Sequence, residues 1–147
     1  MEDAGDSDPS TGPPDRRTLQ LLDRRLVGHS LVSVTEYRPD SYEPRLLRAR
    51  LDGERFPDAV TAARLDIRWF TTGDFSLHYV ETHGDDTEWE CRWDRHPNEH
   101  NTRLHFHRPP NGNDVDDLSL SSTHPMEVYV TVFEAIRRRL TTLWDDN

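Results

Sequence analysis

The chain has 147 residues, of which only 33% are hydrophobic, so it can bury a modest core beneath a very polar surface. It carries 28 acidic and 18 basic residues, which give a net charge of -10. Its single cysteine, Cys91, excludes an internal disulfide and a zinc site built from several cysteines.

All the basic residues are arginines, and a lysine-free, Asp-rich surface is typical of cytoplasmic proteins of salt-loving organisms. In low salt this charge would count against nucleic-acid binding, but molar salt screens that repulsion. No apolar run approaches the roughly 20 residues of a membrane span. The first ten residues lack the basic and apolar regions of a signal peptide. We therefore expect a cytoplasmic protein with no membrane segment.

The N-terminal third contains a tail, a helix and two strands. Residues 1–14 are mostly acidic residues, Gly, Ser and Pro, which predicts a disordered acidic tail before a single α+β domain over 15–147. Asp15 or Thr18 could cap a short helix that ends at Gly28. Its buried face would carry Leu19, Leu22 and Leu26. Residues 31–38 and 45–51 are predicted strands, and residues 53–59 a loop.

From residue 64 onward, apolar and polar residues alternate in three consecutive segments, which is typical of a half-buried antiparallel meander. The apolar positions are Leu65, Ile67 and Trp69, then Phe75, Leu77 and Tyr79, then Trp89, Cys91 and Trp93. Three-residue loops at 71–73 and 84–86 keep these positions on one face, because a slip of one residue would invert every side chain. This register places His78 opposite Arg92 and Ser76 opposite Asp94.

The C-terminal third begins with a Pro- and Gly-containing stop at 108–113 and an acidic, Ser-rich loop at 114–122. A helix is predicted to start at His124-Pro125. Its apolar stripe would be Val128, Val132, Ala135, Ile136, Leu140 and Leu143, with Phe133 and Trp144 beside it. We interpret residues 137–139, three consecutive arginines, as a solvated helix face. The predicted fold is α+β, an antiparallel meander of about five strands with the C-terminal helix packed on its aromatic face.

The segment Arg92–His107 is the candidate functional site. It reads RWDRHPNEHNTRLHFH and holds four of the eight histidines, with three arginines and two acids, in sixteen residues. Imidazole can give and take protons near neutral pH, and arginine offers a planar fork for phosphate oxygens. Such a set could cleave RNA without a metal, one imidazole acting as base and another as acid, while an arginine stabilises the transition state.

Candidate residues for each role can be named. The candidate catalytic residues are Arg92, Asp94, His96, His100, His105 and His107. His96 or His100 would work with His105 or His107. Asp94 would orient an imidazole, and Arg92 would contact the scissile phosphate. Candidates for binding the substrate are His78, Arg95, Arg103 and Arg108.

Other interpretations stay open. The same face could bind protein or RNA without turnover. His105 and His107 share one face if 104–107 is extended, and His96 and His100 have a helix-compatible spacing, so imidazoles with a carboxylate could hold Zn²⁺, although no zinc signature is matched. A polar His- and Arg-rich segment can also be simply a solvated loop. The cofactor, if any, and the oligomeric state stay undetermined.

Residues 67–144 resemble the toxin TumE family, small α+β proteins usually encoded beside a helix-turn-helix antitoxin. The resemblance is carried by a hairpin, the run Arg92-Trp93-Asp94 and the His-x-His pair His105-Phe106-His107. The family usually has Tyr at the Trp93 position, Asn at the Arg95 position, and a lysine within the histidine cluster. The resemblance implies a toxin with RNA as the expected target and an antitoxin as partner.

Overall fold

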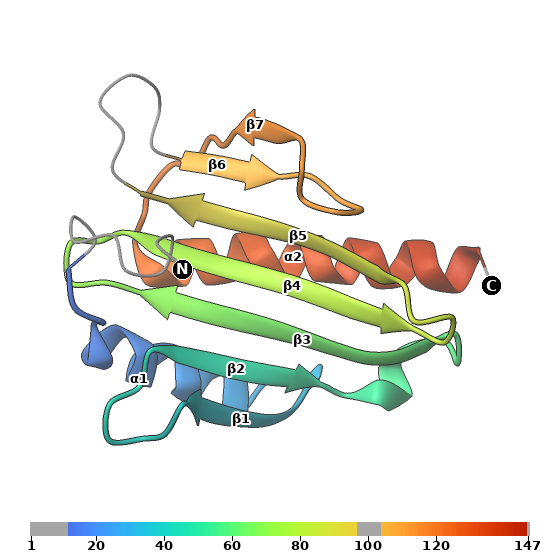
Figure 1. The fold of residues 1–147 in the computed structure, drawn as a ribbon, viewed down its shortest axis with the longest axis horizontal. Helices are drawn as coiled ribbons and strands as arrows, with labels where there is room; N and C mark the ends of the chain where they lie inside the picture. Colours follow the sequence, from blue (N-terminus) through green and yellow to red (C-terminus); the bar gives the residue numbers. More distant parts are fainter. Residues whose placement is uncertain (1–11, 97–103, 147) are drawn as a thin grey trace.

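The computed structural model describes residues 12–96 and 104–146, which form a seven-stranded sheet with both helices on one face (Figure 1). The strands lie in sequence order, and each pairs antiparallel with its neighbours. The elements in chain order are α1 (Arg16–Val27), β1 (Val32–Arg38), β2 (Leu46–Leu51), the 3₁₀ turn Gly53–Arg55, β3 (Val60–Trp69), β4 (Phe75–His83), β5 (Glu88–Arg95), β6 (Leu104–His107), β7 (Val115–Asp117) and α2 (Pro125–Asp145).

The predicted fold class is confirmed, but the predicted number of about five strands is wrong. β6 and β7 extend the sheet beyond β5, and β7 lies inside the segment predicted to be an acidic loop. Both strands are short, and every residue of β7 is exposed. Backbone pairing rather than apolar alternation therefore defines β7, so no hydrophobic pattern marks it in the sequence.

The register predicted for the central meander is confirmed. Trp69 pairs with Phe75, and Leu77 pairs with Trp93. Gly73 closes the first three-residue loop with a φ of 91°, a left-handed conformation that favours glycine. The structure also pairs the polar positions as predicted, His78 with Arg92 and Ser76 with Asp94.

Helix α1 begins where the sequence predicts. The Asp15 carboxylate accepts a hydrogen bond from the Thr18 backbone N–H at 3.1 Å and so caps the helix. Three of its four leucines, Leu19, Leu22 and Leu26, are fully buried against the sheet. Of the predicted N-terminal tail, residues 1–11 lie outside the described residues. Pro13 accepts a backbone hydrogen bond from Thr71 N–H at 2.9 Å, beside the β3–β4 turn.

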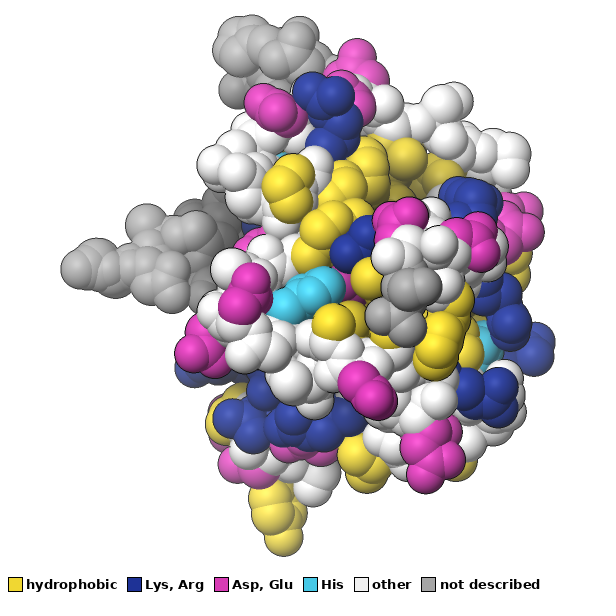
Figure 2. Space-filling model, turned by 90° about the vertical axis from the view of Figure 1, so that its right-hand side faces the viewer, with side chains coloured by type: hydrophobic (Ala, Val, Ile, Leu, Met, Phe, Trp, Pro, Cys, Tyr) yellow, Lys and Arg dark blue, Asp and Glu magenta, His cyan; other side chains and the backbone are white. Residues whose placement is uncertain are grey.

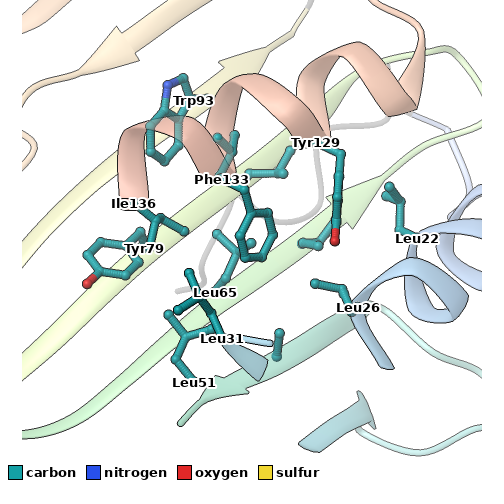
Figure 3. Close-up of a cluster of buried hydrophobic side chains, with 14 of the residues drawn as sticks. Leu22, Leu26, Leu31, Leu51, Leu65, Tyr79, Trp93, Tyr129, Phe133 and Ile136 are labelled. Carbon is teal, nitrogen blue, oxygen red and sulfur yellow. The ribbon is translucent and has the colours of Figure 1, made fainter. Parts of the chain in front are cut away.

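Helix α2 supplies the other half of the layer that covers the sheet (Figure 3). His124 caps it, with Pro125 in the first turn. Its buried residues are Val128, Tyr129, Val132, Phe133, Ile136 and Leu140. Tyr129 belongs to this stripe although the sequence analysis omitted it, and Trp144 is half exposed. Within the described chain, no helix is long and apolar enough to cross a bilayer.

One of the three consecutive arginines contradicts the prediction of a solvated helix face. Arg139 binds Glu81, a fully buried carboxylate on the helix side of β4, through two contacts of 2.9 Å. Its guanidinium also lies 3.7 Å from the Trp89 ring centroid. Glu81 accepts further hydrogen bonds from Tyr79 (2.7 Å) and His83 (2.9 Å). Burial of Glu81 in an apolar layer requires a cation, and α2 provides one.

This buried pair gives a prediction about stability. The change Arg139→Met should lower the free energy of unfolding by about 3–5 kcal/mol, because it leaves the Glu81 carboxylate buried without its cation. The matched control is Arg138→Met on the exposed side of the same helix turn, for which we expect a change within about 0.5 kcal/mol. Urea unfolding at neutral pH measures both, and equal effects would contradict the structural role of the pair.

Candidate functional site

The face of the sheet opposite the helices is lined by polar side chains from adjacent strands. Alternation along each strand turns Asp66 of β3, His78 of β4 and Arg92 of β5 to this face, and β6 adds His107 beside Arg92. In the next row of the sheet, Asp94 is flanked by Ser76 and His105. The histidines of β6 and the acid and arginine of β5 are therefore direct neighbours.

Asp94 is the centre of this cluster. Only 7% of its side chain is exposed. One carboxylate oxygen, Oδ2, accepts a hydrogen bond from Arg92 Nε at 3.1 Å and lies 2.9 Å from Nε2 of His107. The same nitrogen of His107 lies 3.0 Å from an Arg92 terminal nitrogen. Arg92, Asp94 and His107 thus form a closed triangle of contacts.

The other oxygen of Asp94, Oδ1, faces two more histidines. His105 Nδ1 is 3.7 Å away and His96 Nε2 is 4.0 Å away, both beyond hydrogen-bond distance. Among the described residues, Asp94 Oδ1 is the one buried side-chain oxygen or nitrogen without a hydrogen-bond partner. The rings of His96 and His105 have centroids 5.4 Å apart. This oxygen, which has no hydrogen-bond partner, and the two imidazoles therefore lie close together.

A network of ion pairs stiffens the sheet beside the cluster. Arg48 binds Asp66 through two hydrogen bonds, of 2.7 and 3.1 Å, and Arg64 adds a third of 3.2 Å. Burial alone would raise the pKa of the Asp66 carboxyl, but the two arginines outweigh burial and hold this pKa below its ordinary value. His78, next along the row, is bonded to Glu90 at 2.8 Å.

Two of the predicted site residues do not join the cluster. Arg95 follows Trp93 on the helix side of β5 and binds the buried carboxylate of Asp74 at 2.7 Å. Arg108 is exposed and pairs with Asp116 of β7 at 3.2 Å. Two others, His100 and Arg103, lie outside the described residues.

The structure adds partners that the sequence analysis did not single out. Glu90 fixes the His78 ring, and Asp66 organises two arginines on the same face. Both acids occupy outward positions of the alternating strands that the sequence already defines. The predicted register of β3, β4 and β5, followed across all three strands, places Asp66 and Glu90 on the same face as His78 and Arg92.

The helix side of β5 and β6 carries a different feature, an apolar groove of about 320 Å³ beside the second half of α2. Hydrophobic side chains gather in the upper half of Figure 2, which views the molecule from the end where α2 terminates. Cys91 lines this groove but is buried, and burial raises the pKa of its thiol to about 12. The cysteine is therefore a neutral core residue, as predicted, and lies on the face away from the histidines.

The fold and the cluster together define a class: a small α+β protein whose open sheet face presents imidazoles, a guanidinium and a buried carboxylate at one point. The chain belongs to the toxin TumE family, whose family model matches residues 18–140. Membership of a toxin family indicates the toxin component of a toxin–antitoxin system and makes an antitoxin partner plausible. Comparison with curated proteins and with solved structures finds no match.

The lowered pKa of Asp66 gives a prediction about pH. A carboxyl whose pKa is lower when folded stabilises the fold above its unfolded pKa, about 3.9, and this stabilisation is lost as pH falls through the folded value. The change Asp66→Asn should therefore cost about 1–3 kcal/mol at pH 7 and less at pH 3, because part of the stabilisation is lost below the unfolded pKa. Urea unfolding at both pH values tests this, with the exposed Asp58→Asn as control. A cost that is the same at both pH values would refute the ion-pair explanation.

Proposed function

We propose that this toxin is a ribonuclease that cleaves RNA by acid–base catalysis at the cluster centred on Asp94. The observation that carries the proposal is the contact of 2.9 Å between a buried carboxylate and His107, with Arg92 and His105 beside it. A carboxylate that orients an imidazole is the recurring arrangement for a general base. The cluster also lies on the sheet face that no described helix covers, where a long polymer can approach it.

The protonation of His107 follows from its neighbours. Its Nε2 lies 2.9 Å from an Asp94 oxygen, which can only accept, and 3.0 Å from Arg92, which can only donate. One nitrogen cannot both donate a hydrogen bond to Asp94 and accept one from Arg92. Because the buried Asp94 carboxylate needs donors, we assign the proton to Nε2, directed at Asp94. In this tautomer the lone pair is on Nδ1, which lies 3.4 Å from an Arg92 terminal nitrogen and is the candidate base.

His105 is the proposed acid. Its ring centroid is 6.5 Å from that of His107, and the two rings are nearly perpendicular. Two imidazoles at this separation can address two different oxygens of one phosphodiester. His96, whose ring centroid is 5.4 Å from His105 and whose side chain is 47% exposed, gives His105 a route for proton exchange with water.

The proposed reaction is an internal transesterification. The 2′-oxygen of RNA attacks the adjacent phosphorus, and its proton passes to Nδ1 of His107. The bond from phosphorus to the 5′-oxygen breaks, and that oxygen takes a proton from the His105 imidazolium. The products are a 2′,3′-cyclic phosphate and a 5′-hydroxyl. Arg92, whose terminal nitrogen is 3.4 Å from Nδ1 of His107, stabilises the charge that builds on the phosphoryl oxygens.

The proposed partner is a helix-turn-helix antitoxin encoded beside this chain. The family membership supports an antitoxin in general, and the helix-turn-helix class is the finer part of the proposal. Co-expression with the product of the neighbouring reading frame should suppress growth arrest and yield a complex of the two chains. A neighbouring frame that encodes no DNA-binding protein would contradict the finer part.

Substitution of the two imidazoles tests the reaction. The changes His107→Asn and His105→Asn should each lower the cleavage rate about 10²–10⁴-fold, because each removes one proton-transfer group. The matched control is His124→Asn, which keeps an N-cap acceptor on α2 and lies outside the site, and its rate should be unchanged. Cleavage of a labelled RNA in excess chelator, with detection of the cyclic phosphate, provides the measurement.

Two outcomes would overturn the proposal. Growth arrest that persists undiminished in the double variant His105→Asn/His107→Asn would show that the toxin acts elsewhere. RNA binding by the purified protein with no cleavage, and with no product carrying a cyclic phosphate, would identify a non-enzymatic binding module on the same face.

A further inference from the structure

The free oxygen of Asp94 faces two imidazoles at distances that suit a shared ion better than a hydrogen bond. Asp94 Oδ1, His96 Nε2 and His105 Nδ1 all lie within 4.8 Å of one another. The distances from the oxygen, 3.7 and 4.0 Å, exceed hydrogen-bond range. Two ligands at about 2.1 Å from a tetrahedral zinc ion are about 3.4 Å apart. Small movements of the side chains would therefore bring these three donor atoms to coordination distance from one ion.

We propose that Asp94, His96 and His105 bind a first-row transition-metal ion of the zinc type. The buried carboxylate oxygen without a partner is the second, independent indication of a ligand, because leaving such an atom unsatisfied costs free energy that a cation would recover. Two imidazoles and one carboxylate are a donor set that zinc accepts, with remaining positions for water. Calcium and magnesium prefer all-oxygen sites, so they fit this set poorly.

The surroundings also match a metal ligand. The second oxygen of Asp94 is already fixed by Arg92 and His107, at 3.1 and 2.9 Å, so the carboxylate is oriented before an ion arrives. His105 is held in the sheet by its pairing with Asp94 and Asp117. His96 follows β5 directly, and its half-exposed side chain leaves an entry path from solvent. The carboxylate and His105 are therefore held in place before an ion binds, and small side-chain movements would bring the three donor atoms to zinc.

The ion would compete with catalysis. Zinc takes the lone pair of a neutral imidazole, so a bound ion would keep His105 from becoming the imidazolium that the proposed cleavage requires. On the basis of the proposed function, zinc should therefore inhibit RNA cleavage, and removing it should restore the rate. Since protons and zinc compete for the same nitrogens, the affinity for zinc should fall as the pH is lowered.

Zinc binding can be measured without RNA. Calorimetric titration of the tag-free protein with ZnCl₂ should give one ion per chain and a higher thermal midpoint. The changes His105→Asn and His96→Ala should each weaken binding more than about 10-fold. His96 is half exposed, so its replacement tests the site without threatening the fold. The control His124→Asn should leave stoichiometry and affinity unchanged.

Further outcomes separate this inference from the proposed function. No binding at micromolar zinc, or binding equally tight in His96→Ala and His105→Asn, would overturn the metal site whether or not RNA is cleaved. Binding that depends on both histidines, in a protein that cleaves no RNA, would support the metal site and leave the ribonuclease proposal refuted. Acceleration of cleavage by zinc would overturn its inhibitory role.

Discussion

The structure depends on one constraint, the alternation of side chains across β3, β4 and β5. From Ala63 onward, odd-numbered residues in these strands face the helices, while even-numbered residues such as His78, Arg92 and Asp94 face the other way. Two loops with an odd number of residues preserve this order from strand to strand. The same register that buries Trp93 therefore presents Asp94 beside His105 and His107.

The two carboxylate oxygens of Asp94 have different surroundings. Its Oδ2 is bound by Arg92 and His107, and this fixes the orientation of the carboxylate. Its Oδ1 has no hydrogen-bond partner and faces His96 and His105. Glu81, on the opposite face, differs because Arg139, Tyr79 and His83 satisfy it completely. A fully satisfied buried acid is structural, whereas a half-satisfied one marks a position where a ligand or a proton can act.

The sequence was sufficient for the central meander and for the pairing of Asp94 with Ser76, because period-two patterning and loop length determine register. It was insufficient where structure does not depend on apolar pattern. β7 is held by backbone pairing alone, so its exposed residues resembled a loop. Arg139 resembled its exposed neighbour Arg138 because only the position of Glu81 distinguishes them. Arg95 could have been excluded from the site, since it lies two residues beyond the inward-facing Trp93.

The order of the strands has a consequence for folding during synthesis. Every strand pairs with its neighbours in sequence, so the sheet can grow hairpin by hairpin as the ribosome releases it. However, α2, which covers Leu65, Tyr79 and Trp93, is translated after all seven strands of the sheet. The apolar face of the nascent sheet is therefore exposed until α2 is synthesised. During that interval the chain is prone to aggregate and can be bound by chaperones.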